Sequence, residues 1–300
     1  MKFTVIGSIN TDLVINTSRM PKLGETLNGT GFSTGCGGKG ANQAVAVAKL
    51  GGDVTFIGAV GKDANGDIAI NNFKENGIST DRIERTDVNT GVAVITVAGS
   101  DNCIILDSGA NGLVTKEVID KNMDIISSAD AVIMQLEIPM ETVVYAAQKA
   151  HGAGVKVVLN PAPVTDLPQE LLKNTDVIIL NETETEYITK IYPDTDESRK
   201  ECMDILKGLG ISQVIITLGG EGCVYNNGDE ICHQPAFKAN VVDTTAAGDT
   251  FIGAFCMKMT SDLEYAVKYA TAASSITVSR HGASGSIPTK DEVEEFIANK

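Results

Sequence analysis

Residues 131–160 read AVIMQLEIPMETVVYAAQKAHGAGVKVVLN. Within this stretch a continuous apolar run (Ala131–Leu136) is followed by an amphipathic segment (Glu141–His151) and by a second apolar run (Val155–Leu159). Short continuous apolar runs are typical of strands buried on both faces, whereas apolar residues spaced three and four apart predict a helix. The stretch therefore predicts a strand, a helix and a second strand, which is the repeating unit of a parallel sheet.

The same alternation continues along the rest of the chain. Further strands are predicted at Phe3–Ser8, Val54–Val60, Val177–Leu180, Val214–Leu218 and Val224–Asn226. Further helices are predicted at Gly38–Leu50, Asn65–Asn76, Lys116–Ile126, Glu182–Ile191, Glu197–Leu209, Ala247–Met259, Leu263–Ser279 and Lys290–Ala298. This order predicts an α/β fold with a doubly wound, mainly parallel sheet. Since no Pro/Ser-rich linker, repeat or low-complexity tract interrupts it, residues 1–300 are expected to form a single domain.

Two regions break the alternation and contain no helix pattern. Residues 11–35 are rich in Thr, Asn and Gly, and residues 90–107 contain two apolar runs (Val92–Val97 and Cys103–Leu106) joined by a turn-like segment. Two such runs separated by a few turn residues are typical of a hairpin. We expect both regions to form a small β-sheet that projects from the main sheet and could act as a lid.

Composition excludes several classes of protein. Lys and Arg number 24 against 39 Asp and Glu, a net charge of −15, which argues against a protein that binds nucleic acid or an anionic membrane. No run approaches the ~20 apolar residues of a membrane-spanning helix. The six cysteines form no C-x-x-C pair, and the N-terminal run is interpreted as a strand rather than an export signal. We therefore expect reduced thiols and a cytoplasmic location.

The strongest local motif is VVDTTAAGDTF at residues 241–251. We interpret it as a strand end that runs into small residues and then into a helix. Ala246, Ala247 and Gly248 would let a ligand approach the backbone, whose free N–H groups at a helix start attract an anion. Asp249 is either a helix-capping carboxylate, which the bare pattern favours, or a general base beside a phosphate. Asp243 could be a cap, a loop anchor or a cation ligand.

A second motif, GCGGKGANQ at residues 35–43, opens a predicted helix. Its glycines match the dinucleotide pattern G-x-G-x-x-G, but residues 28–34 are too polar for the buried strand that should precede that pattern. Asp53 also stands before the next predicted strand, not after it, so a dinucleotide site is not expected. We favour a backbone that packs against a small polar ligand, with Lys39 and Asn42 facing it. A tight turn with a surface lysine is the alternative.

Polar residues follow several predicted strands at the edge where open α/β sheets bind ligands. Asn10 and Asp12 lie two apart in an extended segment, so they point to the same side and suit vicinal hydroxyls, although both also favour turns. Glu137 stands at another strand end. Asn181 and Glu184 open a helix, where acidic residues usually complement the helix dipole.

Taken together, three motifs resemble one enzyme family. Gly7–Asp12, residues 37–45 (GGKGANQAV) and Asp243–Phe251 are similar, in this order and separation, to motifs of the ribokinase branch of the ribokinase/phosphofructokinase-B family of sugar kinases. The likeness covers essentially the whole chain. It implies a three-layer α/β/α core with a β-sheet lid that is often shared in a homodimer. It also implies transfer of the ATP γ-phosphoryl group to the primary 5-hydroxyl of ribose, with Mg²⁺ and a monovalent cation, expected to be K⁺.

The resemblance further implies roles for individual residues. Asp249 would be the general base, and the amides of Ala246, Ala247 and Gly248 would form the anion hole. The sugar would contact Asn10, Asp12, Gly38, Lys39, Asn42, Glu137 and Asp249. The nucleotide would lie along Asn181, Glu184, Thr217, Gly219, Gly248 and Thr271, with Glu184 also acting indirectly on Mg²⁺; Thr271 stands where family members often have Asn. The monovalent cation would be held by Asp243, Thr245, Val278, His281, Ala283 and Ser286.

Other functions stay open at this level. The same chemistry could act on another pentose, sugar or nucleoside such as deoxyribose, and Asp12 is the residue to test, because a carboxylate that contacts a ring hydroxyl penalises its absence. A sugar- or nucleotide-binding protein without turnover is a second alternative, against which the presence of both Asp249 and Ala246–Gly248 argues. A dinucleotide oxidoreductase is the weakest.

Overall fold

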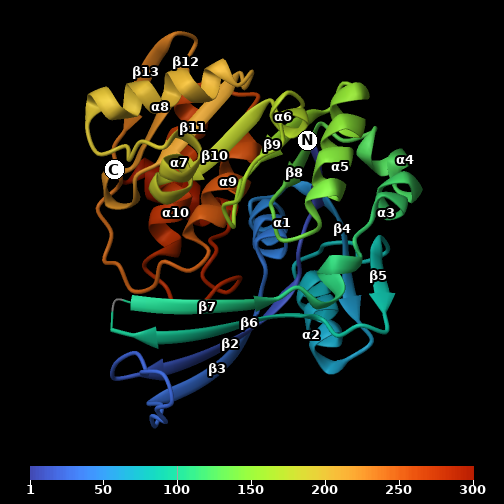
Figure 1. The fold of residues 1–300 in the computed structure, drawn as a ribbon. Helices are drawn as coiled ribbons and strands as arrows, with labels where there is room; N and C mark the ends of the chain where they lie inside the picture. The colour runs from blue at the N-terminus through green and yellow to red at the C-terminus, as the bar shows by residue number, and fades with distance from the viewer. Residues whose placement is uncertain (100) are drawn as a thin grey trace.

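The fold was obtained as a computed structural model that describes residues 1–99 and 101–300 (Figure 1). Within these residues the main sheet has nine strands in the order β13-β12-β11-β10-β9-β8-β1-β4-β5. Their bounds are β1 (Lys2–Ile6), β4 (Asp53–Gly61), β5 (Ile83–Thr86), β8 (Ala131–Met134), β9 (Lys156–Leu159), β10 (Val177–Asn181), β11 (Gln213–Thr217), β12 (Cys223–Asn227) and β13 (Glu230–Gln234). Across the sheet, the neighbouring strands β5, β4, β1, β8, β9, β10 and β11 pair in parallel, and β12 and β13 add an antiparallel edge.

Helices cover both faces of this sheet, because side chains along each buried strand alternate between two apolar layers. Within β1, Val5 belongs to one layer and Ile6 to the other. The first layer packs against α1 (Lys39–Lys49), α2 (Ala64–Glu75), α9 (Ala247–Lys258), α10 (Leu263–Thr277) and α11 (Lys290–Ala298). The second packs against α3 (Lys116–Lys121), α4 (Met123–Ile126), α5 (Met140–Gly152), α6 (Gln169–Leu172), α7 (Glu182–Thr189) and α8 (Asp196–Gly208). The predicted three-layer α/β/α fold is confirmed.

A separate four-stranded sheet, in the order β3-β2-β6-β7, projects from the body at the lower left of Figure 1. It consists of β2 (Asn10–Thr17), β3 (Gly31–Gly37), β6 (Gly91–Ala98) and β7 (Asp101–Asp107). Strand β2 pairs antiparallel with β3 and parallel with β6, so the two predicted regions 11–35 and 90–107 meet in one sheet. Ser100, inside the second region, lies outside the described residues. We call these four strands the lid sheet.

The chain reverses its direction of travel across the main sheet beside β1. After β1 it adds β4 and β5 on one side, whereas β8 to β13 build outward from the other side. In open α/β sheets, the carboxyl ends of the strands at such a switch point form the ligand-binding crevice. The segment that follows β1 and the segment that follows β8 are therefore placed to form a site.

The structure corrects two details of the predicted elements. Val241 and Val242 are not a strand end: they lie in an irregular segment, 64% and 40% exposed, because two apolar residues among polar ones find no neighbouring strand to pair with. The helix predicted over 116–126 is divided into α3 and α4 at Asn122, whose backbone leaves the helical region (φ −113°, ψ 15°). Among the described residues, no helix combines the length and apolar content needed to cross a membrane.

Candidate active site

The carboxyl ends of β1 and β8 are joined through Glu137. Its Oε2 atom accepts hydrogen bonds from the Ser8 hydroxyl, from the Lys39 backbone N–H at 3.0 Å and from Asn10 Nδ2 at 3.5 Å. Asn111 fixes the Asn10 amide in turn, because its Nδ2 donates to Asn10 Oδ1 at 2.7 Å. One carboxylate thus holds two strand ends and the first residue of α1 together.

The glycine motif lies directly against these strand ends. Gly38 has a positive φ of 93°, and a Cβ there would stand 2.8 Å from the backbone N of Asn10. A Cβ at Gly40 would stand 2.7 Å from the backbone N of Ser8. Both distances are too short for any side chain, so glycine is required for α1 to begin at this edge. The motif is therefore a close packing of two backbones and not a surface turn, whereas the predicted packing against a polar ligand stays a prediction.

Asp249 reaches the same place from the first turn of α9. It is 9% exposed, and both of its oxygens are bonded to amides of α1: Oδ2 accepts from Asn42 Nδ2 and Oδ1 from Gln43 Nε2, each at 3.0 Å. Ala246, which precedes the helix, has a left-handed backbone (φ 60°) that turns the chain into α9. The acid predicted as a cap or a base therefore points into the crevice with its orientation set by two donors.

Charges are concentrated around Asp249. Burial, reinforced by the negative charges of Glu137 and Asp249, raises the pKa of the Asp12 carboxyl to about 7. Burial alone would lower the pKa of the Lys39 ammonium, but Asp249, Glu137 and Glu184 outweigh it and the net direction is upward. Burial also raises the pKa of Glu184, although the Asn181 N–H and Lys39 oppose it. The site therefore holds one firmly protonated cation among several acids.

Two cavities adjoin this cluster. One of about 200 Å³ is lined by Lys39, Asn160, Ile179, Leu180, Asn181, Glu184, Thr217, Thr244, Ala246, Gly248, Asp249 and Ile252. The other, of about 230 Å³, lies under the lid sheet and includes Asn10, Glu137 and the lid residue Leu106. The bond from the Lys39 backbone to Glu137 links the two. Asp249 lines the first of these cavities.

The start of α9 provides backbone donors to the first cavity. In the first turn of a helix the N–H groups have no intrahelical acceptor and carry the positive end of the dipole. The Ala247 N–H donates to the Thr244 carbonyl at 3.2 Å. Gly248 is exposed and lines the cavity, so its amide is the accessible member of the predicted Ala246–Gly248 set.

Asn181 and Glu184 line the cavity and also cap α7. The Asn181 side chain accepts from the Glu184 N–H at 2.8 Å, and the Glu184 carboxylate accepts from the Asn181 backbone N–H at 3.0 Å and from its Nδ2 at 3.2 Å. Both residues therefore cap α7 and also line the cavity, and their predicted role toward a nucleotide stays a prediction.

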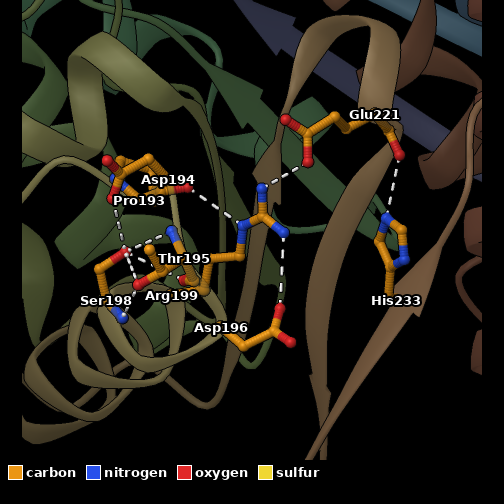
Figure 2. Close-up of polar contacts among 8 residues, drawn as sticks. All are labelled: Pro193, Asp194, Thr195, Asp196, Ser198, Arg199, Glu221 and His233. Carbon is orange, nitrogen blue, oxygen red and sulfur yellow. Dashed lines mark hydrogen bonds and ion pairs between the residues drawn. The ribbon is translucent and has the colours of Figure 1, made fainter.

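Of the other predicted nucleotide residues, Thr217 lines the cavity, whereas Gly219 begins the short turn Gly219–Glu221 (η2) beyond it. Figure 2 shows how that turn is held. Arg199 of α8 bonds Glu221 Oε2 at 2.6 Å and the Pro193 carbonyl at 3.1 Å, and the Glu221 carbonyl is 2.9 Å from His233 Nε2. Arg199 is 8% exposed, so the turn rests on a buried guanidinium.

Thr271 is not brought to either cavity. Its side chain is buried within α10 and donates to the carbonyl of Val267, one turn earlier, at 2.9 Å. The hydroxyl therefore has its partner inside its own helix.

The predicted cation residues form a separate cluster beside the start of α9. Asp243 joins two segments: it accepts from the Thr245 N–H at 2.9 Å and from the Gly282 N–H at 3.0 Å. Burial opposes ionisation of Asp243, but these bonds prevail and hold its pKa below the ordinary value. The Val278 carbonyl accepts from the N–H groups of Val242 and Asp243, and the Ser286 hydroxyl donates to the Ala283 carbonyl at 2.6 Å.

Sequence reasoning assigned no role to five polar residues at the site: Asn160 and Asn111 line the two cavities, and Ser8, Gln43 and Gln135 hydrogen-bond to residues of the site. Ser8, Gln135 and Asn160 each stand within two residues of a strand end, and Gln43 follows Asn42 in the glycine motif. Strand-end polarity was the available signal. Which of these residues reach the crevice depends on packing.

Comparisons with known proteins agree with this geometry. Residues 2–290 match the model of the pfkB family carbohydrate kinases. The chain belongs to the pfkB family. A ribokinase from Haemophilus influenzae is 42% identical over 298 residues, covering 98% of this chain and 97% of that protein. A deoxyribokinase from Salmonella typhi is 37% identical over 303 residues, covering 99% of each. The structure of Arabidopsis thaliana ribokinase complexed with ribose and ATP superposes with a TM-score of 0.90 at 33% identity, covering 98% of each chain.

Proposed function

We propose that this carbohydrate kinase transfers the γ-phosphoryl group of ATP to the 5-hydroxyl of D-ribose. The observation that carries the proposal is the Asp249 carboxylate, which is buried at the start of α9 and lines the same cavity as Lys39, Asn181 and Gly248. Pfkb-family relatives named ribokinase, similar over nearly their whole length, support ribose as the acceptor.

In this proposal Asp249 accepts the proton of the hydroxyl as its oxygen forms a bond to the γ-phosphorus, and ADP leaves with the electrons of the broken P–O bond. Phosphoryl transfer depends mainly on positioning and on stabilising charge. The two bonds from α1 position Asp249. The Gly248 amide and the Lys39 ammonium, whose residues line the same cavity, would stabilise the negative charge on the phosphate oxygens.

The sugar would be held by Asn10, Asp12, Lys39, Asn42 and Glu137, with Gly38 leaving room for it. Asn42 supports this assignment, because its Oδ1 is buried and has no hydrogen-bond partner among the described residues, while its Nδ2 is bonded to Asp249. An unpaired buried acceptor is costly. A sugar hydroxyl would satisfy it.

Magnesium fits this site as a companion of the nucleotide. Among the described residues, no group of three or more acidic, histidine or cysteine side chains could hold a metal ion by itself. Glu184, with both oxygens bonded to Asn181, would act on the ion through water. When bound, Mg²⁺ neutralises phosphate charge.

A monovalent cation, with K⁺ as our choice, would lie between the segments that Asp243 joins. Oxygen atoms of Thr245, His281 and Ser286 lie in those segments. The Val278 and Ala283 carbonyls fit less well, because each already accepts two hydrogen bonds. The ion would hold the loop before α9 in place.

The lid sheet would close over ribose and exclude water, which prevents ATP hydrolysis. It exposes large apolar side chains, Ile15, Phe32, Val94, Ile104, Ile105 and Leu106. An exposed apolar patch of this kind marks an interaction surface. We propose that the protein forms a homodimer through the lid sheet. The six free cysteines and the use of ATP favour the cytoplasm.

The test is an assay of ADP formation with ATP, Mg²⁺ and a panel of ribose, deoxyribose, hexoses and nucleosides, with and without K⁺. We expect ribose to give the highest kcat/KM and K⁺ to stimulate it. A preference for deoxyribose would identify the activity named for the Salmonella relative. Binding of ribose without ADP formation would contradict the proposal and identify a binding protein.

A further inference from the structure

We infer that Gln43 is a positioning residue that aims the Asp249 carboxylate, and that Gln135 and Asn160 lock it. The inference rests on the proposed role of Asp249. Gln43, Gln135 and Asn160 come from α1 and from the segments that follow β8 and β9, and they are 0%, 0% and 7% exposed. None of the three has a charge, so their effect on Asp249 is one of geometry and donation.

A backbone carbonyl determines the direction of the hydrogen bonds that run from Asn160 through Gln43 to Asp249. The Ile179 carbonyl can only accept, so Asn160 must direct its Nδ2 there, at 3.1 Å. Asn160 Oδ1 is then left to accept from Gln43 Nε2 at 3.3 Å. Gln43 therefore presents its NH₂ group, and not its oxygen, to Asp249 Oδ1 at 3.0 Å.

Gln135 closes the chain from the other side. Its Nε2 donates to Gln43 Oε1 at 2.5 Å. A flipped Gln43 amide would present its NH₂ group there and could not accept this hydrogen bond. Gln135 Oε1 is buried without a hydrogen-bond partner among the described residues. A buried, unpaired acceptor destabilises the fold by itself. The presence of this unpaired oxygen is understandable if Gln135 serves to fix the orientation of Gln43, and that orientation matters for function.

The consequence concerns the first step of the reaction. A base must be aligned with the hydroxyl it deprotonates, and small displacements reduce the rate strongly. Asn42 also holds Asp249, but in our proposal it contacts the sugar as well, so it cannot be free of substrate binding. Gln43 touches Asp249, lines neither cavity and is given no substrate contact in our proposal. Its loss should therefore reduce kcat and leave KM for both substrates nearly unchanged.

The first experiment uses Gln43→Met, which keeps the length of the side chain and removes its three hydrogen bonds, to Asp249, Asn160 and Gln135. We expect kcat to fall by about 10- to 100-fold, with KM for ribose and ATP within about 2-fold of wild type. The charged groups that face Asp249 from other positions, Asp12, Lys39 and Glu184, are unchanged in the variant.

The matched control is Asn122→Leu, which removes a buried amide far from the site, between α3 and α4. We expect it to lower the thermal midpoint and to leave kcat and its pH profile unchanged. A wild-type kcat in Gln43→Met would overturn the inference. So would a rise in KM for ribose that accounts for the whole loss, because Gln43 would then be a substrate contact.

A second variant covers the case in which Gln43→Met does not fold. Gln43→Glu has the same shape and can donate to Asp249 only while the new carboxyl is protonated. We expect a new descending limb of kcat as pH rises and both acids ionise. A profile without that limb would contradict the inference. An active Asp249→Asn would instead contradict the proposed function, whatever the Gln43 variants do.

Discussion

At the scale of the residue, Asp249 shows why a short pattern does not assign a role. In the sequence it is an acid at a helix start, where a carboxylate is common for local reasons. In the structure its two oxygens accept hydrogen bonds from Asn42 and Gln43 of another helix, not from the backbone of α9. A carboxylate bound in this way is not needed as a cap, which supports its proposed role as the base.

Replacement of that carboxylate tests the role directly. We expect Asp249→Asn to fold normally and to lose about 10²- to 10⁴-fold in kcat, the usual contribution of a general base. An amide has nearly the same shape, so the fold should be kept, with a loss of about 1 to 3 kcal/mol because the new NH₂ group faces one of the two donors, Asn42 Nδ2 or Gln43 Nε2. Steady-state kinetics with ribose and ATP, together with a thermal unfolding curve, provide the measurement. A kcat near that of wild type would contradict the assignment.

Asp12 leads to a prediction for stability against pH. Its pKa is 3.8 ordinarily and about 7 in the folded protein. Between pH 3.8 and about pH 7 the folded state therefore binds more protons at Asp12 than the unfolded state does. The contribution of Asp12 to the free energy of unfolding is greatest below pH 3.8 and falls until about pH 7. Asp12→Asn removes this loss. We expect the variant to be stabilised relative to wild type by about 1 to 3 kcal/mol more at pH 8 than at pH 5, since each pKa unit corresponds to about 1.4 kcal/mol.

Urea unfolding at both pH values measures this difference, and ribose binding should weaken in the same variant. The matched control, measured in the same way, is Asp107→Asn, which removes an exposed acid at the end of β7 in the lid sheet. An equal effect of Asp12→Asn at both pH values would contradict the prediction.

At the scale of the element, the starts of α1 and α9 form the centre of the site. The first turn of each helix contains glycine and alanine. The two helices also pack directly together, since a Cβ at Gly253 of α9 would stand 2.5 Å from Ala46 Cβ of α1. Periodicity predicted both helices within one or two residues. It wrongly placed a strand before α9, because Val241 and Val242 are apolar but belong to a loop whose hydrogen bonds go to Val278.

The turn that begins at Gly219 also depends on another element. Arg199 of α8 bonds the Glu221 carboxylate and is itself fixed by the Pro193 carbonyl (Figure 2). We expect Arg199→Ala to lower stability by about 1 to 3 kcal/mol, because bonds from a buried charged group are lost. We also expect KM for ATP to rise several-fold and KM for ribose to stay constant.

A matched control is Arg82→Ala, which removes another arginine pair, with Asp124, at the surface. Exposed pairs contribute about 0 to 1 kcal/mol, so stability and kinetics should hardly change. Equal KM values for ATP in Arg199→Ala and wild type would show that the turn does not contact the nucleotide.

At the scale of the whole molecule, the lid sheet is attached to the body beside the site, since β2 begins four residues after β1 ends. Its faces expose Phe32 (66%) and Ile105 (67%), which are large costs in water for an isolated sheet. We expect wild type to be a dimer and the double variant Phe32→Asp, Ile105→Asp to be monomeric with reduced activity. Light scattering coupled to size-exclusion chromatography measures the mass.

Leu23→Asp is the control, because Leu23 is fully exposed in the loop between β2 and β3 and lies outside the lid strands. It should remain dimeric. A monomeric wild type would contradict the proposed interface. The single-domain organisation, also a proposal, predicts one cooperative thermal transition for residues 1–300; two separate transitions would count against it.

The order of strands and helices, the buried sheet and the polar residues at strand ends could be predicted from the sequence alone, because they depend on local periodicity and on backbone chemistry within a few residues. The partners of Asp249 could not, since Asn42 and Gln43 lie 207 and 206 positions away. The raised pKa of Asp12 and the internal bond of Thr271 were equally hidden. Each depends on burial and on distances between remote segments, and these exist only once the complete fold has packed.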